Sequence, residues 1–162
     1  MTTRTTAPGT GLGQSRFNRF MARWLASPFG ALSGRVVLVR YAGRVSGLPR
    51  QLPVNCGSYE GGYLISVGRS ERKRWWRNFR SPWPIELVRG RRVITGSAVA
   101  VPGTTERGQR IAADYFAAHR GAVKRTGLPR LPKGERPSPE AVQAAAAKMV
   151  FVLVTPDRFP GD

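Results

Sequence analysis

The 162 residues have about the length of one domain, and 41% are hydrophobic, enough to bury roughly two thirds of the unfolded surface and to exclude disorder throughout. Lys and Arg number 27 against nine Asp and Glu, and the formal net charge of +18 predicts an anionic partner. The single cysteine, Cys56, excludes an intramolecular disulfide and a cysteine-based zinc site, and the longest apolar run, residues 149–154, is too short to span a bilayer.

The first third of the chain is cationic, because residues 1–59 contain eight arginines and no acidic residue. Residues 1–14 are rich in Thr, Gly and Pro without apolar periodicity, which predicts a flexible tail. Such an acid-poor start is also typical of an organelle transit peptide.

Residues 15–27 are predicted to form a basic amphipathic helix. Its apolar side chains recur at helical spacing, at Phe17, Phe20, Met21, Trp24 and Leu25. Two interpretations remain open: the helix packs on the rest of the domain or on a second subunit, or the segment from Arg16 to Leu25 lies in a membrane interface.

Five apolar or mixed runs in the middle of the chain predict antiparallel strands joined by glycine-rich turns. The runs are residues 36–41, 50–56, 63–67, 85–89 and 92–101. Within the last of them, Gly96 indicates a bulge or a close approach of another backbone segment.

Helices and one more strand complete the pattern. Ser70 is expected to cap a helix over residues 71–79, Thr104 one that continues to His119, and Ser138 one that ends near Lys148. Residues 120–137 are expected to form a loop and residues 149–154 a buried strand. Because strands and helices do not alternate, the sequence predicts an α+β fold, a small antiparallel β-barrel decorated by helices, over residues 28–156, with a tail at 157–162.

The sequence is poorly supplied for hydrolysis or for metal binding. His119 is the one imidazole and the nine acidic residues are scattered, so neither a catalytic triad nor a metal site is predicted. Chemistry by an enzyme of this composition would therefore depend on an organic cofactor.

Two basic segments are candidates for binding an anionic ligand. Residues 69–80 combine six cations with Trp75 and Trp76, which suits phosphate binding and ring stacking; an amphipathic helix with a solvated basic face explains the same pattern. Residues 43–50 place Arg44, Ser46 and Arg50 around glycines, which suits an anion cradle or a plain hairpin turn.

Taken together, these segments resemble the deazaflavin-dependent nitroreductase family, a group of split β-barrel, FMN-binding-like oxidoreductases. The resemblance covers about residues 36–100 and rests on the order and spacing of four motifs. They are Gly43-Arg44-Val45-Ser46-Gly47-Leu48-Pro49-Arg50, then Pro53, then Ile65-Ser66-Val67-Gly68-Arg69, then Trp75-Trp76-Arg77-Asn78-Phe79. Val45 departs from the family's usual Lys and Trp76 from its usual Tyr, and the loop before Trp75 is about two residues shorter.

The resemblance implies a site for deazaflavin coenzyme F-420. Arg44, Ser46 and Arg50 would lie along its phosphate and glutamate tail, and Val45 and Pro53 would also belong to the cofactor site. Ser66, Val67, Gly68 and Arg69 are expected near the ring or phosphate, and the residues expected alongside are Lys73, Trp75, Trp76 and Asn78. The implied reaction is hydride transfer from the reduced coenzyme to an electrophile such as a quinone, an activated alkene or a nitro compound.

Two alternatives stay open beside this reductase: a split barrel that uses FMN or another flavin-like ligand, and a non-enzymatic basic module that binds nucleic acid or anionic lipid. Of these polyanions, nucleic acid is the less expected. For the reductase the sequence and the resemblance together suggest a homodimer in the cytoplasm, with peripheral contact to the inner face of the cell membrane through Arg16 to Leu25.

Overall fold

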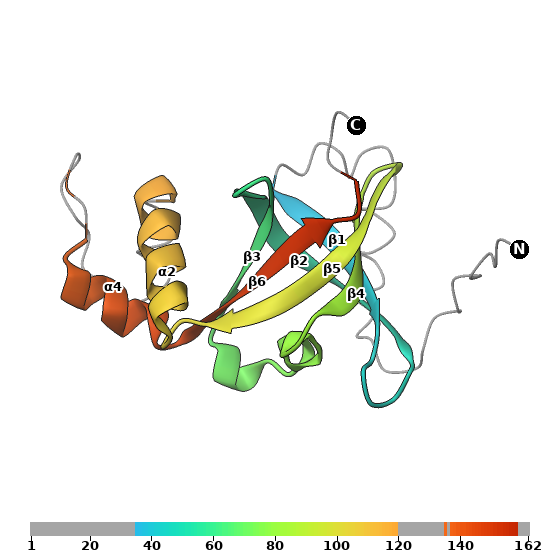
Figure 1. The fold of residues 1–162 in the computed structure, drawn as a ribbon, viewed down its shortest axis with the longest axis horizontal. Helices are drawn as coiled ribbons and strands as arrows, with labels where there is room; N and C mark the ends of the chain where they lie inside the picture. The colour runs from blue at the N-terminus through green and yellow to red at the C-terminus, as the bar shows by residue number, and fades with distance from the viewer. Residues whose placement is uncertain (1–34, 120–134, 136, 159–162) are drawn as a thin grey trace, which may run out of the picture.

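The computed structural model describes residues 35–119, 135 and 137–158, which form a closed antiparallel barrel (Figure 1). The strands are β1 (Val36–Ala42), β2 (Pro49–Tyr59), β3 (Gly62–Gly68), β4 (Trp83–Arg89), β5 (Arg92–Pro102) and β6 (Met149–Pro156). Around the barrel they follow the order β1-β2-β3-β6-β5-β4, and β4 pairs with β1 to close it. The predicted helix-decorated antiparallel barrel is confirmed.

Some expectations fall outside the described residues. They are the tail at 1–14, the helix at 15–27, nearly all of the loop at 120–137 and the last four residues. In the part of the chain that the structure describes, no helix is long and apolar enough to cross a membrane. The homodimer, the cytoplasmic location and the membrane contact of residues 16–25 stay predictions.

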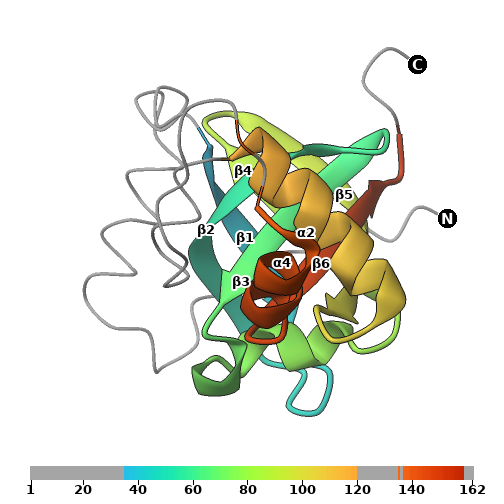
Figure 2. The same cartoon turned by 90° about the vertical axis from the view of Figure 1, so that its left-hand side faces the viewer.

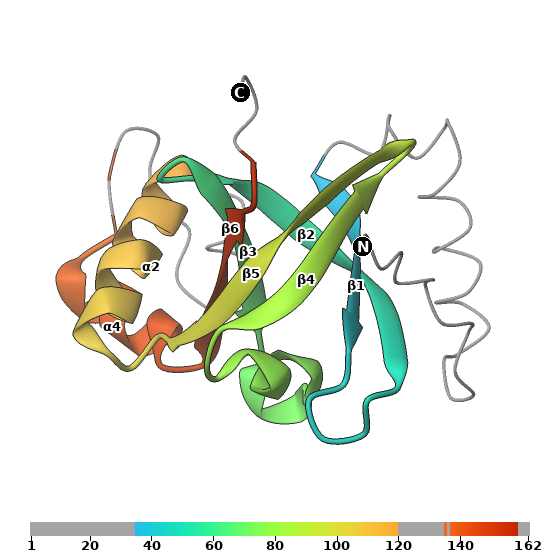
Figure 3. The same cartoon turned by 45° about the vertical axis from the view of Figure 1, so that its right-hand side comes forward.

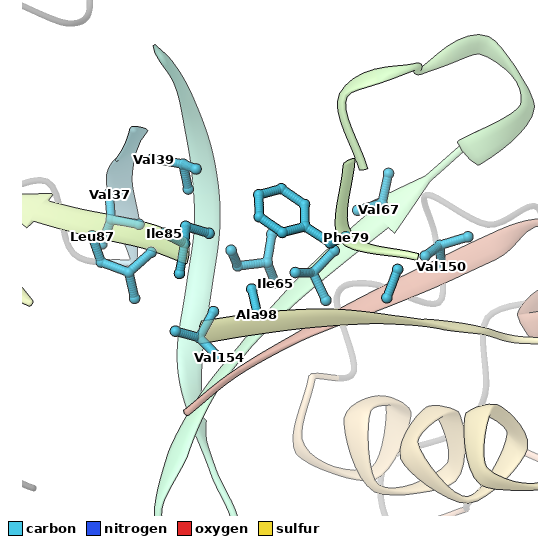
Figure 4. Close-up of a cluster of buried hydrophobic side chains, with 12 residues drawn as sticks. Val37, Val39, Ile65, Val67, Phe79, Ile85, Leu87, Ala98, Val150 and Val154 are labelled. Atoms are coloured by element: carbon cyan, nitrogen blue, oxygen red, sulfur yellow. The ribbon is translucent and has the colours of Figure 1, made fainter. Parts of the chain in front are cut away.

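Side chains alternate between the barrel interior and its outer face. In β6 the inward residues are Val150, Val152 and Val154, and all three are buried. They pack with Val37 and Val39 of β1 and with residues of every other strand to fill the barrel (Figure 4). A side chain of suitable size at every second position of six strands closes the interior without a channel.

Helices α2 (Glu106–Ala118) and α4 (Pro139–Ala146) cover one outer face of the barrel, in front of β3 and β6 (Figure 2). Phe151 of β6 packs there against Ile111 and Phe116 of α2, and all three side chains are buried. Because β6 is covered on both sides, it consists of a nearly continuous apolar run. Thr105 and Ser138 cap the two helices through their side-chain oxygens, which accept hydrogen bonds from backbone amides at 3.0 Å and 3.2 Å. The cap predicted at Thr104 is therefore wrong by one residue, because the Thr105 hydroxyl is the one that reaches the Gly108 amide.

The helix expected over residues 71–79 is wrong in form. The segment contains two short 3-10 helices, η2 (Ser70–Arg72) and η3 (Trp75–Phe79), separated by an extended Lys73. Ser70 does not cap a helix, because its hydroxyl donates to the Lys148 carbonyl at 3.2 Å. Arg69, in the left-handed region with φ of 50°, turns the chain at this point. A tertiary contact and a backbone reversal therefore override the local helical pattern.

The close approach expected at Gly96 is confirmed. A Cβ atom there would meet the backbone carbonyl of Thr155, whereas one at Gly57 would enter open space. We expect Gly96→Ala to lower the free energy of unfolding by about 1 to 3 kcal/mol, because a backbone carbonyl cannot rotate away as a side chain can. Urea unfolding measures the change. Gly57→Ala, also in a strand, is the matched control and should stay within about 0.5 kcal/mol of the wild type; equal effects would contradict this packing.

The alkylation rate of the Cys56 thiol is a second test of how closely the barrel is packed. The thiol packs against the interior core, and burial raises its pKa to about 12, although Arg89 acts in the opposite direction. The reactive thiolate is therefore scarce near pH 8. We expect alkylation of the native protein by iodoacetamide at pH 8 to be at least about 100-fold slower than alkylation in urea. Mass spectrometry follows the reaction, and comparable rates would show that the thiol is accessible.

Candidate functional site

The turn between β1 and β2 contacts η3 at one end of the barrel, mainly through Arg44. The backbone amide of Arg44 donates to Asn78 Oδ1 at 2.8 Å, and its Nε donates to the Asn78 carbonyl at 2.9 Å. Its Nη2 donates to the carbonyls of Ser81 at 2.7 Å and Pro82 at 3.1 Å. The guanidinium also lies 4.4 Å from the ring centre of Trp83. These contacts join two motifs that are 34 residues apart in the sequence.

The turn itself is closed by its own hydrogen bonds. The amide of Gly43 donates to the Leu48 carbonyl at 2.8 Å, and the amide of Gly47 donates to the Gly43 carbonyl at 2.8 Å. Ser46 Oγ accepts from the Leu48 amide at 3.2 Å, so this hydroxyl is engaged within the turn. Gly47 has a φ of 66°, a conformation that side chains with a Cβ rarely adopt.

Aromatic side chains hold η3 on the end of the barrel. Phe79 is fully buried in the barrel interior (Figure 4). Its ring centre lies 5.2 Å from that of Tyr41 and 6.1 Å from that of Trp75. Trp76 is partly exposed and donates through Nε1 to the Ser70 carbonyl at 2.9 Å. The segment therefore closes the barrel with Phe79 while its cations point to solvent.

Residues 43–50 and 69–80 together form what we call the basic end. Figure 3 shows the β1–β2 turn beside the two 3-10 helices at the lower end of the barrel. The basic end carries eight exposed cations against a single acidic residue, Glu71. The cations are Arg44, Arg50, Arg69, Arg72, Lys73, Arg74, Arg77 and Arg80. The guanidinium carbons of Arg77 and Arg80 lie 5.9 Å and 5.7 Å from the ring centre of Trp76.

The structure divides the site residues inferred from sequence into two groups. Nine belong to the basic end: Arg44, Val45, Ser46, Arg50, Arg69, Lys73, Trp75, Trp76 and Asn78. The other four lie within β2 and β3. Among them, Val67 faces the barrel interior, so only its backbone is available to a ligand outside, and Pro53 pairs with Leu38.

Ser66 and Gly68 lie on the outer face of β3, directly before the basic end. Ser66 Oγ donates to the hydroxyl oxygen of Tyr115 on α2 at 3.0 Å. A Cβ atom at Gly68 would meet nothing within 4 Å, so the strand surface is open at that position. The last residues of β3 therefore join the basic end to the face that carries α2.

A pocket of about 280 Å³ lies on that face between α2 and the strands β2 and β3. Ser66 and Gly57 line it on the side of the strands, while Tyr115 of α2 and His119, the residue after this helix, line the other side. The Tyr115 and His119 rings stack with centres 4.7 Å apart. Sequence reasoning identified Ser66 but missed the others as site residues. The available signal was the spacing of residues 114, 115, 118 and 119, which share a helix face.

Tyr59 and Asp114 form the outer side of this pocket. The Tyr59 hydroxyl donates to Asp114 Oδ2 at 2.8 Å. Burial and this hydrogen bond raise the pKa of Tyr59 from 10.0 to about 12, so its hydroxyl keeps its proton to a higher pH than that of a free tyrosine. Residues 35–119, 135 and 137–158 contain no group of three His, Cys, Asp or Glu side chains able to hold a metal ion. The hydroxyls of Ser66 and Tyr115 and the stacked rings of Tyr115 and His119 suit hydrogen bonding and ring contact with an organic molecule.

No family model and no curated protein sequence matches the chain. Solved structures with a similar fold include HutZ, a heme storage protein from Vibrio cholerae, with 13% identity, a TM-score of 0.46 and 79% and 85% of the two chains covered. An F420 reductase has 13% identity, a TM-score of 0.41 and coverage of 86% and 95%. The FAD and heme binding protein from Mycobacterium smegmatis has 16% identity, a TM-score of 0.41 and coverage of 93% and 75%. At these identities the likeness concerns the fold.

The contacts of Arg44 with η3 and the residues after it can be tested by substitution. We expect Arg44→Ala to lower the free energy of unfolding by about 1 to 2 kcal/mol, because it removes several charge-assisted hydrogen bonds. Asn78→Ala should lower it by about 0.5 to 1.5 kcal/mol, because the backbone amide of Arg44 loses its Oδ1 acceptor while the carbonyls that accept from the Arg44 side chain remain. Urea unfolding measures both changes. Arg91→Ala, in the exposed β4–β5 turn, is the control for loss of an arginine and should stay within about 0.5 kcal/mol of the wild type; an equally small loss from Arg44→Ala would contradict the contact.

Proposed function

We propose that this protein is an oxidoreductase that binds deazaflavin coenzyme F-420 and reduces an electrophilic organic compound. The observation that supports it most is the contact between Arg44 and Asn78. It joins the glycine-rich turn and the tryptophan segment, the two motifs on which the family resemblance chiefly rests, into one surface.

The basic end fits the tail of the coenzyme, which carries a phosphate and several carboxylates. Because Arg44 directs three hydrogen bonds to backbone carbonyls, its part is to hold the turn in place. The exposed side chains of Arg50, Arg69 and Lys73 supply the charge-assisted hydrogen bonds to the anions. A surface with eight cations suits a ligand with several negative charges better than one with a single phosphate.

The ring of the coenzyme would lie on the outer face beside Ser66 and Gly68. The open surface at Gly68 leaves room for a planar group, and the adjoining pocket of about 280 Å³ has room for a small acceptor. When bound, the reduced coenzyme supplies a hydride. The hydroxyl pair of Ser66 and Tyr115 holds a proton at the edge of the pocket, 3.0 Å between the oxygens, which suits protonation of the reduced acceptor.

The remaining residues of the pocket position the acceptor and restrict water. The stacked rings of Tyr115 and His119 offer an aromatic wall, and Leu64 offers an apolar one. His119 Nδ1 lies 3.0 Å from the Tyr115 carbonyl, so a proton on Nδ1 donates there and leaves Nε2 as an acceptor. Such a site would assist a hydride transfer by holding the two reactants together in a reactive geometry.

A fluorescence titration with oxidised coenzyme F-420, and in parallel with FMN, tests this function. We expect saturable binding of the deazaflavin that Arg50→Ala weakens about tenfold, because one charge-assisted contact to the tail is lost. Arg91→Ala removes an equal charge from the other end of the barrel and should leave the affinity within about twofold.

The two titrations separate the alternatives. Binding of FMN alone would replace the deazaflavin by a flavin and keep the oxidoreductase class. Equal weakening by Arg50→Ala and Arg91→Ala would mean that net charge, and not the basic end, governs binding. Failure of both ligands to bind would overturn both forms of the proposal.

A further inference from the structure

Two large apolar side chains are exposed on the turn at the basic end. Val45 is 100% exposed and Leu48 is 51% exposed. Among the described residues the only other exposed large hydrophobic side chain is Val93, on the hairpin of β4 and β5. Isolated apolar residues on a surface are common, but two within four residues on one projecting turn form a small apolar tip.

The turn cannot fold back to hide this tip. Its backbone is closed by the bonds from Gly43 to Leu48 and from Gly47 to Gly43, each 2.8 Å long. Arg44, between them, is fixed to the carbonyls of η3 and of the residues that follow it. In Figures 1 and 3 the turn extends beyond the barrel, beside the 3-10 helices. The apolar side chains are therefore held in water by the fold.

The surroundings of the tip are strongly cationic. Arg44 and Arg50 flank it along the chain, and the six cations of residues 69–80 lie on the neighbouring segment. Nucleic acid would satisfy the charge but would gain little from Val45 and Leu48. A protein partner would satisfy the apolar tip, but matching so many cations would need a dense acidic surface. An anionic bilayer satisfies both, because its phosphates lie directly above an apolar layer.

We propose that the basic end docks on the surface of an anionic membrane, with Val45 and Leu48 inserted at the boundary between headgroups and acyl chains. Arg50, Lys73 and the neighbouring arginines contact the lipid phosphates. This surface differs from the segment between Arg16 and Leu25, which the sequence indicated for membrane contact. The proposal does not depend on coenzyme binding, because it is argued from the exposed side chains of the turn and the neighbouring cations. The vesicle experiment below contains no coenzyme, so the two proposals can fail separately.

Sedimentation with vesicles tests the docking on the full chain. The vesicles contain phosphatidylcholine either alone or with about 30% phosphatidylglycerol, at low and moderate salt. We expect binding to the anionic vesicles only, and at least about tenfold weaker binding by the double variant Val45→Ser with Leu48→Ser, which keeps every charge. Val93→Ser is the matched control, because Val93 is 49% exposed beside Arg91 and Arg92 at the other hairpin. It should bind as the wild type does.

A probe on the turn locates the contact. The thiol introduced by Val45→Cys can carry an environment-sensitive dye, since burial raises the pKa of Cys56 to about 12 and slows its labelling. We expect the dye emission to shift to the blue on anionic vesicles and to stay unchanged with duplex DNA of equal phosphate concentration.

Three results would overturn the proposal. The first is wild-type binding by the double serine variant, which would assign any membrane contact to another segment. The second is a dye that responds to DNA as it does to vesicles, which would favour nucleic acid. The third is an absence of binding to anionic vesicles at low salt. Circular dichroism of each variant confirms that it is folded before the comparison is made.

Discussion

The fold holds many positive charges close together at the basic end, and it does so almost without acidic side chains to neutralise them. Its eight cations repel one another, and Glu71 is the single acid among them. Arg44 instead donates to the carbonyls of Asn78, Ser81 and Pro82. Phe79, buried in the barrel, holds the other side of the contact. Carbonyl acceptors and an apolar anchor fix the position of these segments without cancelling their charge, which stays available to a ligand.

The strands of the barrel could be predicted from local patterns in the sequence. Alternating or continuous apolar runs located all six strands, and Ser138 with Pro139 marked the start of α4 correctly. The segment 69–80 could not be read in this way. Its hydroxyl at Ser70 bonds to Lys148, 78 residues away, and Arg69 adopts a left-handed conformation that residues other than glycine seldom take. Neither constraint has a local signature, so the helical spacing of Trp75 and Phe79 gave the wrong structure.

The two parts of the candidate site could be predicted from the sequence to different extents. The basic end is made of two contiguous segments, so composition alone identified it. The outer pocket combines Tyr59 and Ser66 of two strands with Tyr115 of a helix and His119 directly after it, and it exists only because α2 crosses those strands. Its residues are ordinary in isolation. Ser66 links the parts, because it lies two residues before Gly68 and bonds to Tyr115.

The coenzyme and the membrane, which are both proposed to bind the basic end, would share its charges but use different neighbouring surfaces. Binding of any polyanion would reduce the mutual repulsion of the cations, so a coenzyme tail and a lipid surface would bind to the same charges. They differ in what else they satisfy. The coenzyme would extend toward the open strand surface at Gly68, whereas a bilayer would take up Val45 and Leu48 on the turn. Because Arg44 joins the turn to η3, a change in this contact would affect both ligands, while a change at the apolar tip would act on the membrane contact most directly.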